Sequence, residues 1–284
     1  MIELQNLCKT FHSNGKDVKA VDSVSLTVNE GEICVFLGPS GCGKSTTLKM
    51  INRLIAPTSG KVLINGEDTT DLDAVTLRRT IGYVIQQIGL FPNMTIEENI
   101  TVVPRLLGWD KHKCHERARE LMSMIKLEPK QYLHRYPREL SGGQQQRIGV
   151  IRALAADAPL LLMDEPFGAV DPIVRKELQA ETLRLQRELD KTVVFVTHDI
   201  DEAFLLGDQV VILEKGAHIA QVGSPNEILE NPASPFVAEF IGAERGARAL
   251  SLKRTGHGTV VVDATGRAQG VLTDAGESAA EGSA

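Results

Sequence analysis

A glycine-rich segment from Gly38 to Thr46, GPSGCGKST, has residue types and spacing suited to holding phosphate. It matches G-x-x-x-x-G-K-S, in which glycines let the backbone curl so that successive N–H groups point at an anion. Lys44 would reach the β- and γ-phosphates of a nucleotide, and Ser45 would ligate Mg²⁺ at the start of a helix. This phosphate loop predicts nucleotide binding. The expected contacts are Gly38, Pro39, Ser40, Gly41, Cys42, Gly43, Lys44, Ser45 and Thr46.

Two acidic residues close the apolar run from Leu160 to Glu165, LLLMDE. A buried strand is expected there, because the run is short, continuous and apolar. Asp164 is placed to hold a Mg²⁺-bound water, and Glu165 to orient or deprotonate the attacking water. Together with the phosphate loop, the two carboxylates predict Mg²⁺-dependent nucleotide chemistry in which water can be activated. The phosphate loop alone leaves kinases, GTPases, helicases and motor proteins open.

A second glycine motif, LSGGQ from Leu140 to Gln144, precedes an expected helix. Its serine and glycines would form another anion site at the N-terminus of that helix, without a lysine. A second phosphate-binding motif in the same chain implies a role different from that of the phosphate loop. The residues of this signature motif are Ser141, Gly142, Gly143 and Gln144.

Four further residues stand in order around these motifs: Phe11, Gln86 in YVIQQ, Asp171 in GAVDP and His198 in VTHD. Taken singly, each has a simpler interpretation, since a histidine at a strand end is usually structural and a lone glutamine typically lies on the surface. Taken jointly with the glycine motifs, they resemble the ABC ATPase family.

The resemblance implies a nucleotide and metal site. Phe11 would stack on adenine at a position where the family usually has tyrosine, and phenylalanine keeps the aromatic face. Gln86 would bind ATP and serve as a metal ligand together with Ser45. Asp164 would bind the same Mg²⁺ through water.

The resemblance also implies a dimer of two copies of the chain. In the family the signature motif faces the ATP held on the opposite subunit, so two phosphate loops and two signature motifs enclose two nucleotides. Asp171 matches the D-loop of the family. Glu165 would act as general base, and His198 would contact the γ-phosphate and position the water.

The pattern of apolar residues predicts an α/β fold, a P-loop NTPase with a parallel-sheet core. Buried-looking strands at 160–163 and 193–197 flank a long amphipathic helix at about 173–189. Another apolar strand, 33–37, leads into the phosphate loop and a helix at about 44–55.

Two subdomains are expected around this core. Alternating runs in residues 1–28, with a turn at Asn14-Gly15, predict an N-terminal antiparallel β subdomain. Residues 97–128 are predicted to be mostly helical, interrupted at Pro104 and at 108–110. They would lie in an α-helical signature subdomain at about 92–156, inside an ATPase domain of residues 1–242.

Composition narrows the class of protein. A formal net charge of −6 over 284 residues argues against a surface that binds nucleic acid. The four cysteines include no CxxC pair, so neither a disulfide framework nor a zinc site is indicated. No signal peptide is visible, and the apolar runs are far shorter than a membrane span. If this chain acts at a membrane, a partner protein would have to supply the transmembrane segments.

ABC ATPase domains also occur in DNA-repair proteins and translation factors. The repair type would carry a long coiled coil or zinc modules between phosphate loop and signature motif, and the translation type two ATPase domains in one chain. Neither feature is present in this sequence. A transporter ATPase is therefore the favoured interpretation.

A closer resemblance covers roughly residues 1–241. The segments RRTIGYVIQQIGLFPNMTIEENI and RYPRELSGGQQQRIGVIRALAADAPLLLMDEPFGAVDPI are similar to ATPase subunits of bacterial importers for glycine betaine, carnitine and choline. This implies transmembrane permease subunits whose coupling helices dock near Gln86 and after Pro92. It also implies an extracytoplasmic solute-binding protein and a peripheral location at the cytoplasmic face of the bacterial cell membrane. Importers for methionine, other amino acids, polyamines or sugars use the same kind of ATPase subunit and remain alternatives.

The C-terminal segment departs from the family pattern. Residues 243–258 are predicted to be a linker, 258–274 to form two short strands around a turn, and the end to be disordered. Longer relatives carry a pair of CBS modules, and 258–274 resembles one strand-turn-strand fragment of such a module. A vestigial CBS-like segment and an unstructured tail are both expected alternatives.

Overall fold

The structure is a computed structural model. It describes residues 1–13, 15–86, 89–168, 170–242, 251–255, 258–262 and 268–271. The chain divides into two compact units, Met1–Pro225 and Asn226–Ala284, which are described separately. Within the described residues, none of the helices is both long enough and apolar enough to cross a membrane.

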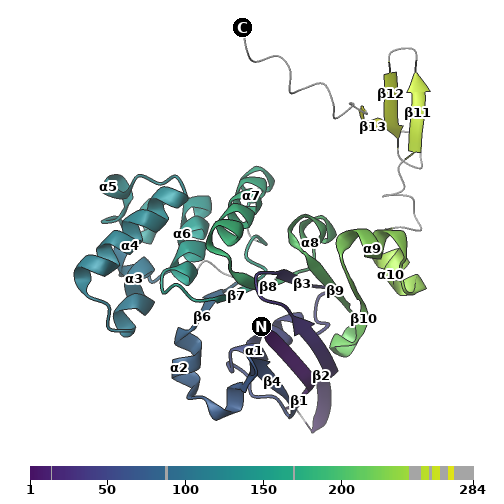
Figure 1. The fold of residues 1–284 in the computed structure, drawn as a ribbon, viewed down its shortest axis with the longest axis horizontal. Helices are drawn as coiled ribbons and strands as arrows, with labels where there is room; N and C mark the ends of the chain where they lie inside the picture. Colours follow the sequence, from purple (N-terminus) through teal and green to yellow (C-terminus); the bar gives the residue numbers. More distant parts are fainter. Residues whose placement is uncertain are drawn as a thin grey trace. The chain divides into compact units, whose positions relative to one another are not determined.

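A six-stranded sheet forms the centre of the first unit, in the order β10-β9-β3-β8-β7-β6 (Figure 1). All neighbouring pairs are parallel except β9 and β10. Every residue of β3, β7 and β8 is buried, as expected for continuous apolar strands covered on both faces. The strands are β3 (Ile33–Leu37), β6 (Ile81–Val84), β7 (Leu160–Asp164), β8 (Thr192–Thr197), β9 (Gln209–Leu213) and β10 (Ile219–Gly223).

Helices cover both faces of this sheet, which confirms the predicted α/β core. In Figure 1, α7 (Pro172–Leu189) and α8 (Ile200–Leu206) lie on one side, and α1 (Lys44–Ile51) lies on the other. The helix α1 ends four residues before the predicted boundary, because Asn52 closes it and Arg53 takes a left-handed conformation with φ of 54°.

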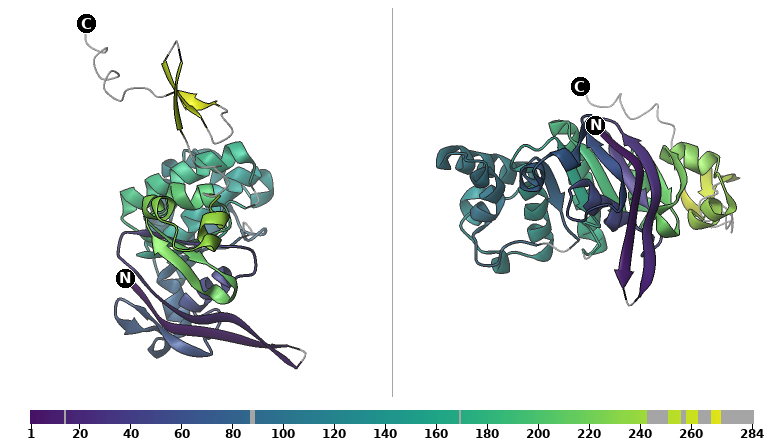
Figure 2. Two further views of the ribbon diagram at one scale, coloured as in Figure 1. Left: turned by 90° about the vertical axis from the view of Figure 1, so that its right-hand side faces the viewer. Right: turned by 90° about the horizontal axis from the view of Figure 1, so that it is seen from below.

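The N-terminal sheet is antiparallel, as predicted, in the order β2-β1-β4-β5. Alternate residues of β2 are buried from Val24 to Val28, so one face of the strand packs on the core. Figure 2 shows the hairpin of the first two strands reaching beyond the others. The strands are β1 (Ile2–Ser13), β2 (Lys16–Val28), β4 (Ser59–Ile64) and β5 (Glu67–Asp68); the short helices η1 (Thr69–Asp71) and α2 (Ala74–Arg79) follow.

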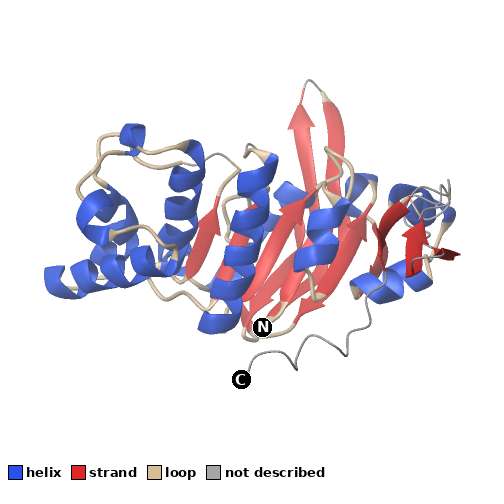
Figure 3. Cartoon of the chain, turned by 90° about the horizontal axis from the view of Figure 1, so that it is seen from above, coloured by secondary structure: helices blue, strands red, loops and turns tan. Residues whose placement is uncertain are grey.

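A helical region lies between β6 and β7 and forms a separate group of helices in Figure 3. Thr95 begins its first helix with a capping box that includes Glu98. The predicted interruption at Pro104 is wrong: the helix continues to Leu106, because a proline near the C-terminal end removes a single hydrogen bond. The elements are α3 (Ile96–Leu106), α4 (Lys111–Met124), α5 (Pro129–Tyr132), η2 (Pro137–Glu139) and α6 (Gly142–Leu154).

The chain continues past β9 through η3 (Lys215–Ala217) and β10, and α9 (Pro225–Glu230) begins at the boundary between the units. The second unit contains α10 (Pro235–Phe240) and a three-stranded sheet, β11-β12-β13. The predicted pair of strands is present as β12 (Gly258–Val262) and β13 (Ala268–Val271). The linker prediction is wrong for β11 (Ser251–Thr255), which pairs with β12. The predicted disordered end, 275–284, lies outside the described residues.

Candidate active site

Four adjacent parallel strands end at the same edge of the sheet. The segments that follow β3, β8, β7 and β6 carry the phosphate loop, His198, Asp164 with Glu165, and Gln86. Strand register aligns these ends, since Leu37 pairs with Thr197 and Asp164 with Val196. In open α/β sheets, ligands bind outside the carboxyl ends of the strands, so this edge is the candidate site.

The phosphate loop holds its lysine close to the backbone. Lys44 is 4 % exposed, and its Nζ donates to the carbonyl oxygens of Gly38 at 2.7 Å and Pro39 at 3.0 Å. Gly43 has φ of 118°, and a Cβ there would lie 2.5 Å from the carbonyl oxygen of Ala20. Only glycine fits that position, so the loop can curl tightly around a phosphate.

Ser45 and Asp164 meet at the base of this loop. The Oγ of Ser45 donates to Oδ1 of Asp164 at 2.6 Å, and Nζ of Lys49 lies 3.8 Å from Oδ2 of the same carboxylate. Asp164 is buried, as its place at the end of β7 requires. A hydroxyl and a carboxylate are the hard oxygen donors that Mg²⁺ prefers, so the pair fits the predicted metal site.

Glu165 gathers two of the predicted residues around one oxygen. Its Oε2 accepts from Nε2 of Gln86 at 3.3 Å and lies 3.1 Å from Nδ1 of His198. The backbone of Glu165 is left-handed, with φ of 44°, and its N–H donates to the carbonyl of Val196 at 3.0 Å. A non-glycine residue in this region is strained, and such strain gathers at functional sites. The side chain of Gln86 contacts Glu165 in this structure, and not the Ser45–Asp164 pair beside which the sequence predicted it as a metal ligand.

The signature motif lies at the N-terminus of α6 and bonds locally. Oγ of Ser141 accepts from the N–H of Gln144 at 3.3 Å, while the N–H of Ser141 donates to Oε1 of Gln144 at 2.9 Å. The two residues form a capping box, and Nε2 of Gln144 also donates to the hydroxyl of Tyr132 at 3.3 Å. A Cβ on Gly143 would lie 2.6 Å from a methyl group of Val174, whereas Gly142 faces open space.

Phe11 and Asp171 lie beside these two regions. Phe11 pairs with Val18 across the hairpin, two residues from the Ala20 that abuts Gly43. Phe11 is 39 % exposed, and Nζ of Lys9 lies over its ring, 5.1 Å from the centre, so an aromatic face is accessible at the surface for stacking. Asp171 caps α7, because its Oδ1 accepts a hydrogen bond from the N–H of Ile173 at 2.9 Å.

Four polar residues near the site were missed by sequence reasoning: Lys49, Tyr83, Gln146 and Arg175. Lys49 lies four positions after Ser45 on α1, so helical spacing alone could have placed it near Asp164. Burial, together with the negative charge of Asp164, raises the pKa of the Tyr83 phenol and keeps it protonated. Gln146 is buried, and its side-chain nitrogen donates to the carbonyl of Pro166, so it joins α6 to the loop after Glu165.

The chain belongs to the ABC transporter family, whose model matches residues 21–168. It is 65% identical over 257 residues to the osmoprotectant import ATP-binding protein OsmV of Salmonella typhimurium, covering 90% of this chain and 67% of that protein. It is 61% identical to the glycine betaine/carnitine/choline transport ATP-binding protein OpuCA of Bacillus subtilis, covering 86% of this chain and 63% of that protein. The chain thus spans about two thirds of the length of the curated relatives it matches.

Solved structures support the same assignment. The dimeric structure of a post-hydrolysis state of an ATP-binding cassette, bound to ADP and Pi, superposes with a TM-score of 0.71 at 36% identity. The match covers 79% of this chain and 99% of that cassette. The predicted fold, a P-loop ABC ATPase, is confirmed by this likeness and by the parallel sheet.

Proposed function

We propose that the chain is the ATP-hydrolysing subunit of a bacterial ABC importer. One observation carries the proposal: the phosphate loop, the Ser45–Asp164 pair and the Glu165 cluster meet at one sheet edge. A phosphate cradle, a metal-ligand pair and a candidate base together suit phosphoryl transfer to water. The names of the relatives, which are import or transport ATP-binding proteins, support the coupling to transport.

The residues divide the chemistry as follows. Lys44 leaves the loop carbonyls to neutralise phosphate charge, and the loop N–H groups hold the phosphates. Glu165 accepts the proton of the attacking water at its carboxylate, and His198, 3.1 Å away, fixes the orientation of that carboxylate and contacts the γ-phosphate. Ser45 and Asp164 would hold Mg²⁺, and Gln86, the third predicted ligand, would join them only after its amide leaves Glu165. The metal would supply charge neutralisation of the phosphate oxygens.

The active unit is a dimer in which each signature motif completes the site of the other copy. Ser141 and Gly142 are exposed at the N-terminal end of α6, where backbone N–H groups point outward. Their contacts within the chain are local, so the anion site they form is open to a second molecule. The structural relative described above is itself a dimer with bound nucleotide products.

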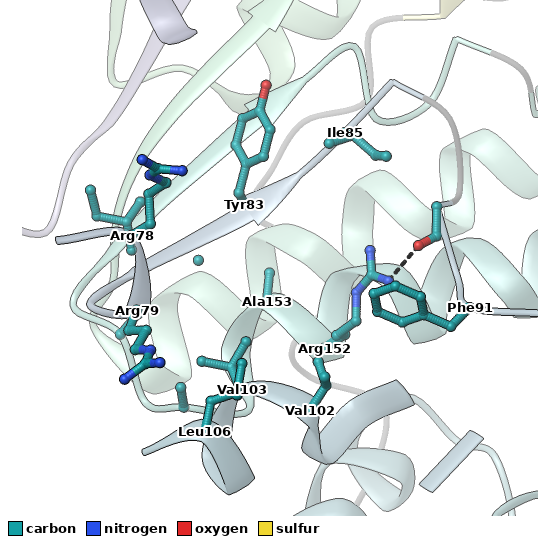
Figure 4. Close-up of a pocket in the computed structure, with 15 residues that line it drawn as sticks. Arg78, Arg79, Tyr83, Ile85, Phe91, Val102, Val103, Leu106, Arg152 and Ala153 are labelled. Atoms are coloured by element: carbon teal, nitrogen blue, oxygen red, sulfur yellow. Dashed lines mark hydrogen bonds between the residues drawn. The ribbon is translucent and has the colours of Figure 1, made fainter. Parts of the chain in front are cut away.

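The permease subunits dock at a cavity of about 380 Å³ beside β6, α3 and α6. Figure 4 shows apolar side chains such as Val103 and Leu106 in its wall, with Arg78, Arg79 and Arg152 around them. Arg152 donates to the carbonyl of residue 89 at 2.6 Å. An apolar floor with three cationic side chains suits an amphipathic helix that carries acidic residues. The lining includes Ile85 and Phe91, the chain neighbours of Gln86 and Pro92, which supports docking in the region expected from the sequence.

The solute is a quaternary-amine osmoprotectant such as glycine betaine, carnitine or choline. This part of the proposal is supported by the names of the relatives, since the residues of the candidate site suit a nucleotide and not the transported solute. An extracytoplasmic binding protein delivers the solute to the permease, and the chain lies at the cytoplasmic face of the cell membrane. An importer for another small solute, such as an amino acid or polyamine, is the alternative.

We also propose the domain limits. Residues 1–242 would be the ATPase domain, with the helical signature subdomain at about 92–156. Residues at about 258–274 would be a vestigial CBS-like segment, with an unstructured tail as the alternative. The uninterrupted group of helices from α3 to α6 supports the helical subdomain.

Uptake measurements test the function. Cells with and without the gene are given radiolabelled glycine betaine, carnitine or choline under salt stress, and a strain with Lys44→Ala serves as the inactive reference. We expect uptake of one or more of these solutes to depend on both the gene and Lys44. Equal uptake in all strains for all three solutes would contradict the quaternary-amine assignment, and labelled methionine and polyamines then test the alternative.

A further inference from the structure

A small polar cluster joins α7 to the loop that carries His198. Arg175 lies on α7, one turn after Asp171, and its backbone N–H donates to the carbonyl of Asp171 at 2.8 Å. One terminal nitrogen of its guanidinium donates to the carbonyl of Val170 at 3.5 Å, and the other to Oδ2 of Asp199 at 3.5 Å. The side chain thus contacts the D-loop and the residue that follows His198.

Asp199 fixes the loop at the start of α8. Its backbone N–H donates to Oγ1 of Thr197 at 3.0 Å, and its Oδ1 accepts from the N–H of Glu202 at 3.1 Å. The second carboxylate oxygen, Oδ2, is the atom that faces Arg175. His198 lies directly between Thr197 and Asp199, so the contacts of Asp199 fix the backbone on one side of the imidazole.

The floor of the cluster is buried. Glu202 is 5 % exposed, and Nε2 of Gln179 on α7 donates to it at 2.9 Å. Nε of Arg175 is also buried and has no acceptor among the described residues. A cavity of about 30 Å³, lined by Glu165, Arg175, His198 and Asp199 among others, lies between them and is large enough for one water.

These contacts leave Arg175 with donor capacity to spare. A guanidinium has five N–H donors in a planar fork, and the bonds of Arg175 to Asp199 and Val170, both 3.5 Å, are at the long end of the range. Either bond can shorten if the D-loop and the switch loop, defined here as Thr197–Asp199, approach each other. Lysine would keep the charge but not the fork.

We propose that Arg175 is a positioning residue that couples the D-loop to the switch loop. In the active dimer the guanidinium ties Val170 to Asp199 and so keeps His198 against Glu165. The inference rests on the proposed function, which assigns hydrolysis to Glu165 and takes a dimer as the active unit. Arg175 contacts neither nucleotide nor water in this role and acts through Asp199 and His198.

The test separates positioning from binding and assembly. The full chain is purified as Arg175→Ala, Arg175→Lys and Asp199→Asn, each also combined with Glu165→Gln. Measured are ATP affinity, ATP-driven dimerisation in the Glu165→Gln background, and kcat and KM for ATP hydrolysis. Lys176→Ala, an exposed neighbour on the same helix, is the matched control.

We expect Arg175→Ala to lower kcat about 10- to 100-fold, since misplacement of a catalytic group by about 1 Å has an effect of that size. KM and ATP affinity should change less than about twofold, and Arg175→Lys should recover only part of kcat. Asp199→Asn should resemble Arg175→Ala. A variant that combines Arg175→Ala with Asp199→Asn, with Glu165 retained, should be no slower than the slower single variant. Lys176→Ala should match the unmodified chain.

Two results would overturn the inference: unchanged kcat in both Arg175→Ala and Asp199→Asn, or additive losses in the double variant. A variant that fails to fold is recognised by its melting curve, and Arg175→Lys then decides. Failure of the proposed function looks different. In that case Glu165→Gln alone neither stops hydrolysis nor assembles an ATP-bound dimer, whatever Arg175 does.

Discussion

The two glycine motifs of the chain are built in opposite ways. In the phosphate loop Lys44 is buried, and Ser45 contacts a carboxylate 119 positions further along the chain. In the signature motif Ser141 is exposed, and its contacts end three residues away at Gln144. One motif is enclosed by its own molecule, whereas the other is presented at its surface.

This difference assigns the two motifs different partners. The phosphate loop has its cation and its metal-ligand pair at hand before any ligand arrives, so a single chain has the groups needed to bind a nucleotide. At the signature motif, Ser141 occupies the N–H of Gln144 only, and the positive end of α6 remains directed outward. An exposed helix N-terminus of this kind contributes to binding only when a second molecule brings an anion to it.

The largest effect is expected on the enclosed side of the comparison. Lys44→Ala removes the buried cation, so we expect loss of ATP binding and ATPase activity below about 1% of the unmodified chain. Binding of a fluorescent ATP analogue and phosphate release are the measurements. Lys111→Ala, at the exposed start of α4, is the control for a lost charge. Undiminished turnover in Lys44→Ala would remove the phosphate loop from the active site.

The second prediction separates chemistry from assembly. Glu165→Gln keeps the shape of the side chain and its contacts to Gln86 and His198 but removes the base, so hydrolysis should fall about 10²- to 10⁴-fold. ATP binding should persist, and size-exclusion chromatography with ATP should show an accumulated dimer. Hydrolysis at the original rate would show that another group accepts the proton.

The signature side can be tested without disturbing its helix. Aspartate and asparagine are as effective as serine at a helix N-terminus, so neither Ser141→Asp nor Ser141→Asn should lower the melting temperature appreciably. Aspartate, however, places a negative charge where the opposite subunit's phosphate would lie. We expect Ser141→Asp to reduce ATP-driven dimerisation and hydrolysis about 10- to 100-fold, with ATP binding to the monomer unchanged.

Asparagine is the matched control and should retain most of the activity. If aspartate and asparagine behave alike, Ser141 is only a helix cap, and the contrast between the two motifs loses its functional meaning.

The elements that position the site were predictable because their signals are local. Continuous apolar runs predicted β3, β7 and β8, and the motif at each strand end followed from the parallel arrangement. Helix ends were less accurate. Residue types alone do not predict that α1 ends at Ile51 or that α3 continues through Pro104. Both depend on the backbone conformation and hydrogen bonds of the residues that follow.

The contacts inside the site were harder to predict for a different reason. That Gln86 and His198 meet at a single oxygen of Glu165 depends on the left-handed backbone at Glu165, which no pattern signals. The side chain of Arg175 contacts Asp199 and so joins two loops. No known sequence motif relates these two positions, so the contact could not be predicted. β11 was mistaken for a linker because its partner strand, not its composition, makes it a strand.

The smallest effect is expected at the outer edge of the enclosed motif. Phe11 is partly exposed and offers an aromatic face near the phosphate loop, so its replacement removes stacking but no charge. Phe11→Ala should raise KM for ATP about 3- to 10-fold, which corresponds to about 0.5–1.5 kcal/mol, with kcat nearly unchanged. Phe11→Tyr keeps the ring and should leave KM within about twofold of its original value. If alanine and tyrosine leave KM equally unchanged, adenine stacks elsewhere, and the nucleotide site is defined by its phosphate contacts alone.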